Sequence, residues 1–228
     1  MLYLSNSTVQ YFPTPMSSCT PTPRPAPGRP KDLAKGLAIL EAAKCMFLEH
    51  GFEGAGMDQI AARAGVSKLT VYNHFGDKEA LFIAAVEHYC EEQVPPALFT
   101  PVPEQPLRER LLDIARALYA LMSSQEAVSG FRLMCTPANR DPSLPEKFWN
   151  AGAGHLQEGF ADLLERRTAA GELSVDDPVR AAAQFFALLR GDIHPRLVIG
   201  CDALAGFDVE AHVAATVDLC LQAWSGRA

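Results

Sequence analysis

The chain of 228 residues lacks any long apolar run, which excludes a membrane-spanning helix. The longest candidate, residues 181–189, is interrupted by Gln184 and is about half the length that a bilayer requires. The sequence also lacks a C-x-x-C pair, and its six cysteines are scattered, which indicates neither a disulfide framework nor a zinc site. A hydrophobic content of 48% with 21% charged residues is ordinary for a globular chain and excludes wholesale disorder.

Signatures of common enzymes are missing as well. There is no H-E-x-x-H motif, phosphate-binding loop or nucleophile elbow. An enzyme remains an alternative only through His155-x-x-Glu158 and Glu87-His88-x-Cys90, and neither has a third ligand at a suitable spacing. Such pairs are usually surface pairs on helices, so we expect no enzyme activity, no metal and no cofactor.

The N-terminal stretch lacks charge, since no charged residue precedes Arg24. It therefore has no positively charged region of a signal peptide, and we expect a cytoplasmic protein. Seven of the 17 prolines fall in residues 13–30, which predicts an extended arm over residues 1–30. Because residues 1–15 show no helical pattern, translation is expected to start at Met16.

The net charge of −7 argues against a protein that coats nucleic acid non-specifically. Residues 24–88 carry eight Lys/Arg and eight Asp/Glu, whereas residues 89–228 carry 12 Lys/Arg and 19 Asp/Glu, a difference of −7. All the excess acid thus lies in the C-terminal part. A DNA-binding surface fits the neutral part, provided that its bases cluster on one face.

From residue 31 onward the apolar periodicity predicts an all-α fold with about nine helices. In the first helix, Leu33, Leu37, Leu40 and Phe47 form one stripe, and Gly51 is expected to end the helix as a left-handed cap. Five prolines between residues 95 and 106 mark a boundary between a domain at 31–93 and a second at 94–228. Pro195 is expected to kink or end the penultimate helix. The predicted helices are 32–50, 58–64, 68–75, 78–93, 106–123, 126–138, 143–170, 178–200 and 208–225.

Residues 58–75, DQIAARAGVSKLTVYNHF, predict a helix, a tight turn at Gly65 and a second helix capped by Ser67. The second helix is about 12 Å long, enough to insert its N-terminal end into a major groove. Its polar side chains suit base edges and phosphates, and Lys78 adds a charge at the start of the next helix. The alternative is an ordinary helical hairpin with solvated polar residues. The candidate DNA contacts are Lys68, Leu69, Thr70, Tyr72, Asn73, His74 and Lys78.

The wider segment carries three patterns in succession, A-x-x-x-F-x-x-x-G-[FY], I-A-x-x-A-G-V-S and Y-x-[HY]-F-x-x-K-x-x-L, within residues 42–82. Residues 32–93 therefore resemble the DNA-binding domain of the TetR family of bacterial regulators, with the helix-turn-helix motif at 56–75. The resemblance implies the same seven contact residues. Two positions depart from the family pattern: Gly56 and Met57 stand where Ser or Thr is usual, and Leu69 stands where many members have Gly.

An upstream basic segment, Gly28-Arg29-Pro30-Lys31, offers two further candidate DNA contacts, Arg29 and Lys31. A basic arm can reach into an adjacent minor groove, where arginine prefers narrow A·T tracts. The equally weighted alternative is a linker with incidental charge.

The C-terminal half, over residues 131–192, resembles the effector domain of AefR-type regulators within the same family. An apolar effector pocket is expected among its central helices, with aromatic and Met side chains that suit a loosely shaped ligand. His155, Arg190, Asp192 and His194 are polar groups that could orient such a ligand. The alternative is that these side chains simply form the core. The predicted pocket residues are Tyr119, Met122, Phe131, Met134, Trp149, Phe160 and Phe186.

The last two predicted helices carry continuous apolar faces. Two such helices per chain can pair across a two-fold axis into a four-helix interface, although they could equally complete the core of one chain. We favour the dimer, because two-fold symmetry places two reading helices about 34 Å apart, one turn of DNA. The predicted interface residues are Phe185, Leu189, Val209, Val213, Val217, Cys220 and Trp224.

These patterns together predict a dimeric regulator, a repressor, that binds a palindromic operator and is released by a small, largely apolar effector. The alternative is a nucleoid- or division-associated DNA-binding protein that acts through protein contacts without a small ligand.

Overall fold

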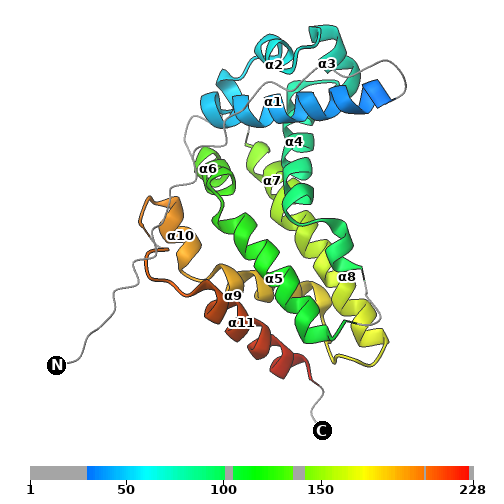
Figure 1. Cartoon of the computed structure of the whole chain (residues 1–228), viewed down its shortest axis with the longest axis vertical. Coiled ribbons are helices and arrows are strands. Elements are labelled where there is room, and N and C mark those ends of the chain that lie inside the picture. The colour runs from blue at the N-terminus through cyan, green and yellow to red at the C-terminus, as the bar shows by residue number, and fades with distance from the viewer. Residues whose placement is uncertain (1–29, 101–104, 136–141, 203, 226–228) are drawn as a thin grey trace, which may run out of the picture.

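The computed structural model describes residues 30–100, 105–135, 142–202 and 204–225. Within these ranges the protein is entirely helical, as the sequence predicted, and a small unit of three helices lies across one end of a longer bundle (Figure 1). None of the described helices is long and apolar enough to cross a membrane. The elements are α1 Pro30–Gly54, α2 Met57–Ala64, α3 Lys68–Phe75, α4 Lys78–Gln93, the 3₁₀ turn η1 Pro96–Phe99, α5 Leu107–Ser123, α6 Gln125–Met134, α7 Leu144–Trp149, the π turn η2 Asn150–Gly154, α8 His155–Ala169, α9 Pro178–Arg190, α10 Ile193–Val198 and α11 Val209–Trp224.

Eleven α-helices in the described residues replace the nine expected, because two predicted helices are divided. The predicted helix at 143–170 contains one π turn, and the helix at 178–200 is broken at Gly191, where φ is +51°. The break expected at Pro195 thus comes four residues earlier. Pro195 instead occupies the first turn of α10, where its missing N–H removes no helical hydrogen bond.

Only part of the stripe expected on the first helix is buried: Phe47 is 3% exposed and Leu40 packs against the same core. Leu33 and Leu37 are 70% and 42% exposed, while Ile39 and Ala43 are fully buried. The helical geometry ends at Gly51, as predicted, but with φ of 73° and ψ of 173°. The φ is positive, whereas the ψ lies far from that of the left-handed helical cap that was predicted. Only glycine adopts this conformation readily, so the chain can turn here toward α2.

The turn between α2 and α3 is shaped by two residues that the sequence singled out. Gly65 adopts the left-handed conformation and closes α2 through its N–H. The Ser67 hydroxyl then accepts a hydrogen bond from the Thr70 N–H at 3.1 Å and caps α3. Val71 is fully buried and fixes α3 against the rest of the small unit. Only the opposite face of α3 is left for solvent.

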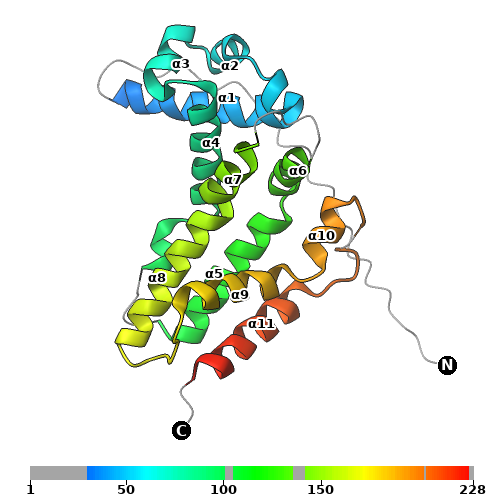
Figure 2. The same ribbon diagram turned by 180° about the vertical axis from the view of Figure 1, so that it is seen from behind.

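The hydrophobic core consists of two clusters that meet along α4. One holds the small unit together and includes Ile39 and Ile60, with Leu81 and Phe82 from the first half of α4. The other fills the bundle and begins at Cys90 on the same helix. The α4 helix therefore belongs to both cores and connects the small unit to the bundle. Figure 2 shows α4 descending from the small unit beside α7 and α8.

Candidate DNA-binding surface and effector cavity

The outward face of α3 presents Lys68, Leu69, Tyr72 and Asn73 to solvent. Leu69 is 69% exposed and Tyr72 is 40% exposed, so both side chains are accessible to a partner molecule. The amide of Asn73 makes no hydrogen bond to any described residue, so all its donors and acceptors are available. This face has the composition that major-groove reading requires.

Two of the predicted DNA contacts are held by acidic residues of the same unit. The Lys68 ammonium lies 2.9 Å from an Asp58 carboxylate oxygen, and this hydrogen bond raises the pKa of Lys68. His74 Nε2 lies 2.9 Å from an Asp32 oxygen. Both acids are exposed, so a phosphate can replace them at little cost. The Thr70 hydroxyl is 2.8 Å from that of Ser67.

Lys78 lies away from the outward face of α3. Its ammonium donates to the backbone carbonyl of Glu53 at 3.2 Å and sits 4.7 Å from the centroid of the Phe52 ring. Burial among these groups lowers the pKa of Lys78. The side chain therefore ties the start of α4 to the end of α1, and its ammonium keeps two further donors for a phosphate.

The remaining N-terminal candidates are only partly described. Lys31 lies in the first turn of α1, and Arg29 lies outside the described residues. At the start of α2, Gly56 has extended geometry, and the Gln59 side chain accepts its N–H at 3.0 Å. Gln59 thus supplies one half of a capping box, while the half that a Ser or Thr hydroxyl would supply is missing, because Gly56 has no side chain.

A cavity of about 130 Å³, partly open to solvent, lies where the small unit meets the bundle. Its walls come from α4, α5, α6, α7 and η2, and also from Lys44, Phe47 and Leu48 of α1. The lining is overwhelmingly apolar and rich in aromatic rings. An apolar small molecule placed here would touch the DNA-binding unit and the bundle at the same time.

Four of the seven predicted pocket residues line this cavity, namely Met122, Phe131, Trp149 and Phe186. His194 also lines it, packed edge-on to the Phe131 ring at 4.7 Å between centroids. Burial, reinforced by the Arg190 charge, lowers the pKa of His194. The neutral imidazole is thereby favoured on the cavity wall.

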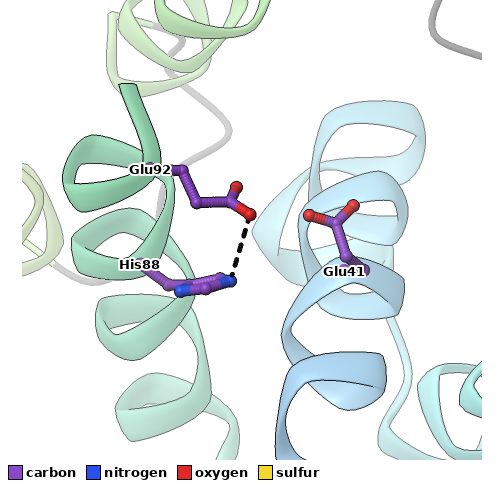
Figure 3. A group of neighbouring side chains, drawn as sticks. All are labelled: Glu41, His88 and Glu92. Carbon is purple, nitrogen blue, oxygen red and sulfur yellow. Dashed lines mark ion pairs between the residues drawn. The ribbon is translucent and has the colours of Figure 1, made fainter. Parts of the chain in front are cut away.

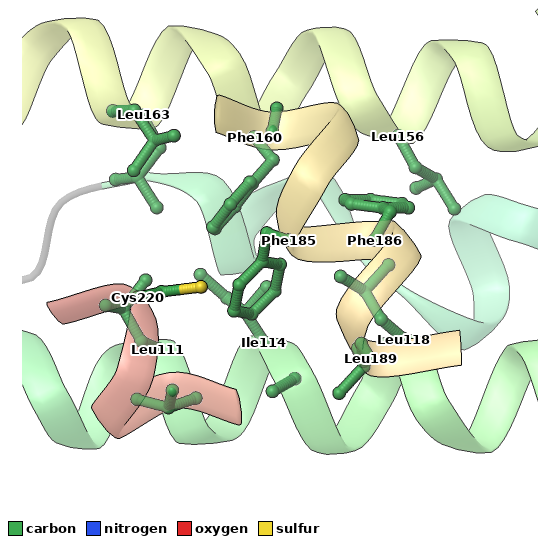
Figure 4. Close-up of a cluster of buried hydrophobic side chains, with 14 of the residues drawn as sticks. Leu111, Ile114, Leu118, Leu156, Phe160, Leu163, Phe185, Phe186, Leu189 and Cys220 are labelled. Carbon is green, nitrogen blue, oxygen red and sulfur yellow. The ribbon is translucent and has the colours of Figure 1, made fainter. Parts of the chain in front are cut away.

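The other three predicted pocket residues lie elsewhere. Tyr119 stacks on Phe207 with ring centroids 6.3 Å apart, on the α11 side of α5. Met134 packs against the core of the small unit. Phe160 is fully buried and stacks on Phe185 at 4.6 Å (Figure 4). These aromatic and Met side chains form core, which was the alternative interpretation.

Three of the polar residues proposed for ligand orientation do not line the main cavity. Arg190 is the last residue of α9 and Asp192 directly precedes α10, and neither lines the cavity, whereas His155 lines a separate hollow between α4, η1 and α8. Conversely, no pattern in the sequence indicated that α1 contributes to a pocket. Its apolar periodicity accounts for Phe47 as core, and nothing in the pattern distinguishes a lysine on a cavity wall from one in solvent.

His88 does not form the Glu87-His88-x-Cys90 cluster that the sequence raised. Its Nε2 faces Glu92 at 3.5 Å, one helical turn along α4, and Glu41 lies opposite on α1 (Figure 3). The three possible ligand atoms lie within 4.8 Å of one another. However, Glu41 pairs with the Lys44 ammonium at 2.7 Å, so partners within the chain account for this arrangement.

Six of the seven predicted interface residues are unavailable to a partner. Phe185, Leu189, Val213, Val217, Cys220 and Trp224 are at most 7% exposed, and they complete the core of the single chain (Figure 4 shows Phe185, Leu189 and Cys220). Val209 alone is partly exposed. The α9 and α11 helices were correctly singled out as apolar, but their most apolar faces point inward.

The outward faces of α9 and α11 are nevertheless unusually uncharged. Val179 and Leu188 of α9 are 73% and 42% exposed, and Leu219 of α11 is 53% exposed. Residues 178–191 contain no Asp or Glu, although the C-terminal part of the chain holds the whole excess of acid. The exposed positions around these large side chains include Arg180, Gln184 and Gln222, but most of them are alanines, namely Ala183, Ala187, Ala211, Ala215 and Ala223.

Comparison with known proteins finds two family matches that together cover most of the described chain. Residues 39–85 match the model of bacterial regulatory proteins of the tetR family. Residues 109–225 match the C-terminal domain of AefR-like transcriptional repressors. The first match covers the exposed α3 helix, and the second covers most of the bundle around the cavity.

Individual proteins agree with these matches. The solved structure of the flavonoid-responsive regulator FrrA is 35% identical, covers 85% of this chain and 98% of that one, and has a TM-score of 0.66. The transcriptional repressor AcnR of Corynebacterium glutamicum is 28% identical over 71% of this chain and 81% of its own length. The transcriptional activator FasR of Mycolicibacterium smegmatis is 38% identical, but over only 31% of this chain and 35% of its own length.

Proposed function

The chain belongs to the TetR family of bacterial transcriptional regulators, and we propose that it is a dimeric repressor released from a palindromic operator by a small, largely apolar effector. The cavity between the small unit and the bundle carries this proposal, since its walls include α1 and α4. A protein that acted through protein contacts alone would have no use for such a cavity. As a DNA-bound regulator the protein would work in the cytoplasm, without a catalytic role.

The proposed release follows from the position of α4 in both cores. An effector that binds one arrangement of α4 and α1 more tightly than another shifts the population toward it. In the dimer, that shift changes the separation of the two α3 helices, and they no longer match half-sites about 34 Å apart. FrrA is named as responsive to flavonoids, which supports an aromatic, mostly apolar effector class.

A DNase footprint on the intergenic DNA upstream of the gene tests the proposal directly. The salt concentration must be fixed, at about 0.15 M, because phosphate-driven affinity depends steeply on it. We expect an inverted repeat to be protected. Weak, uniform binding along the DNA would instead favour the nucleoid- or division-associated alternative.

Asn73→Ala is expected to weaken operator binding by at least about tenfold. A bidentate contact from Asn to an adenine contributes about 1–3 kcal/mol of discrimination, and the dimer makes the contact in both half-sites. Asn73 is exposed and makes no hydrogen bond to a described residue, so the free energy of unfolding should hardly change. Electrophoretic mobility shifts on operator and on random DNA of equal length provide the measurement and its control. An equal loss on both DNAs would assign Asn73 to backbone contact.

Deletion of residues 1–30 tests the proposed arm. If Arg29 reaches a minor groove, the deletion should weaken operator binding severalfold and reduce the salt dependence of the affinity by about one phosphate contact. The control is a chain shortened to Met16, which keeps the basic segment. Unchanged affinity after deletion of residues 1–30 would show that the segment is only a linker.

A further inference from the structure

One edge of the cavity is polar, although the rest of its wall is apolar. Three side chains from three helices meet there: Lys44 of α1, Tyr89 of α4 and Glu126 of α6. The Lys44 ammonium sits 5.3 Å from the centroid of the Tyr89 ring. The Tyr89 hydroxyl donates to Ser124 Oγ at 3.0 Å and lies 3.4 Å from a Glu126 oxygen. One phenol ring therefore has a cation beside its face and a carboxylate beside its hydroxyl.

The charges at this edge discriminate between ligand head groups. A carboxylate ligand that pairs with Lys44 is also repelled by Glu126, which has no cationic partner among the described residues, and an ammonium ligand that pairs with Glu126 is also repelled by Lys44. A neutral hydroxyl avoids both penalties, because it accepts from the ammonium and donates to the carboxylate. Burial raises the pKa of Tyr89 to about 12, so its own hydroxyl stays protonated and donates to Ser124.

We propose that the effector is an aromatic compound with a neutral hydroxyl group that binds at the Lys44–Tyr89–Glu126 edge. This inference rests on the proposed function and specifies the chemistry of its ligand. The aromatic body would pack on the rings that line the cavity, among them Phe82, Phe131 and Phe148. The hydroxyl fixes the orientation of the body, because polar groups in an apolar pocket discriminate strongly against ligands that leave them unpaired.

The same edge brings the ligand into contact with the DNA-binding unit itself. Lys44 belongs to α1, and its ammonium already pairs with Glu41 on the next turn at 2.7 Å. An ammonium has three donors, so a ligand hydroxyl can join this pair without displacing it. The ligand then touches Phe47 and Leu48 as well, one turn further along α1. Effector occupancy is thereby sensed by α1 directly, in addition to any movement of α4.

The experiment uses the full-length protein and one fluorescent reporter, N-phenyl-1-naphthylamine, which is neutral and brightens in apolar cavities. Four competitors share one biphenyl body and differ at position 4: hydroxyl, methoxyl, carboxylate and aminomethyl. We expect 4-hydroxybiphenyl to displace the reporter at a concentration at least about tenfold lower than each of the others does. Lys44→Met and Glu126→Gln should each abolish most of this preference. Lys35→Met, which removes an exposed lysine of α1 outside the cavity, should leave it unchanged.

The outcomes separate this inference from the proposed function. If the reporter binds and all four biphenyls displace it equally well, the cavity accepts apolar ligands but the hydroxyl preference is refuted. A preference for the carboxylate or the aminomethyl compound would also refute it and would assign the edge to an anion or a cation. If the reporter gains no fluorescence with the wild-type protein, the apolar effector cavity of the proposed function fails as well.

Discussion

Leu219→Glu is expected to convert the protein from a dimer to a monomer and to weaken operator binding by about a hundredfold or more. Leu219 is 53% exposed on α11, beside the acid-free outward face of α9. In a two-fold interface the substitution buries two like charges near the axis, and an unpaired buried charge costs several kcal/mol. About 2.8 kcal/mol already corresponds to a hundredfold change in a dissociation constant.

The measurement is sedimentation at micromolar concentration, followed by mobility shifts on the operator. In a single chain the Leu219 position is open to solvent, so the folded monomer should lose no more than about 0.5 kcal/mol of unfolding free energy. Ile199→Glu is the matched control, because Ile199 is 77% exposed directly after the end of α10, outside the α9 and α11 faces. A Leu219→Glu protein that stays dimeric, or a wild-type protein that is monomeric, would exclude this interface.

The sequence predicted the helix-turn-helix unit well because local signals determine it. Gly65 must adopt a positive φ, Ser67 caps α3, and Val71 repeats the apolar period, so each residue specifies its own role. The boundaries of α2 and α3 agree with the prediction to within one residue. The exposed face of α3 follows directly, since it is the face opposite the buried Val71.

The bundle was less predictable because periodicity identifies an apolar face without naming its partner. On α11, Val213 and Val217 lie on the stripe that was expected to meet a second chain, yet they pack within one chain. The outward face of that helix consists mainly of alanines and Leu219. Alanines contribute little to apolar periodicity, so the sequence pattern does not reveal this face. Four of the seven predicted pocket residues do line the cavity, but its polar edge was missed for a related reason. Lys44 and Tyr89 meet across two helices about 45 residues apart in sequence, and no single-helix pattern records such a contact.

Phe185→Ala is expected to lower the free energy of unfolding by about 3–5 kcal/mol. The ring is fully buried, stacked on Phe160 at 4.6 Å and 6.1 Å from the Trp224 ring, so its removal leaves a cavity at the centre of the bundle (Figure 4). Four helices, α5, α8, α9 and α11, pack around this point. They have little freedom to close the space, which places the expected loss near the upper end for a large-to-small substitution.

Urea unfolding of the Leu219→Glu background provides the measurement, because dimer dissociation would otherwise add a concentration-dependent contribution to the apparent stability. Leu188→Ala is the matched control on α9: its side chain is 42% exposed, and in the monomeric background it should lose no more than about 0.5 kcal/mol. When dimerisation is measured in the wild-type background instead, the order of the two effects should reverse. Leu188→Ala should then weaken the dimer, and Phe185→Ala should act mainly on the fold of each chain. If Phe185→Ala instead left the fold intact and dissociated the dimer, the inward stripe of α9 would be the interface after all.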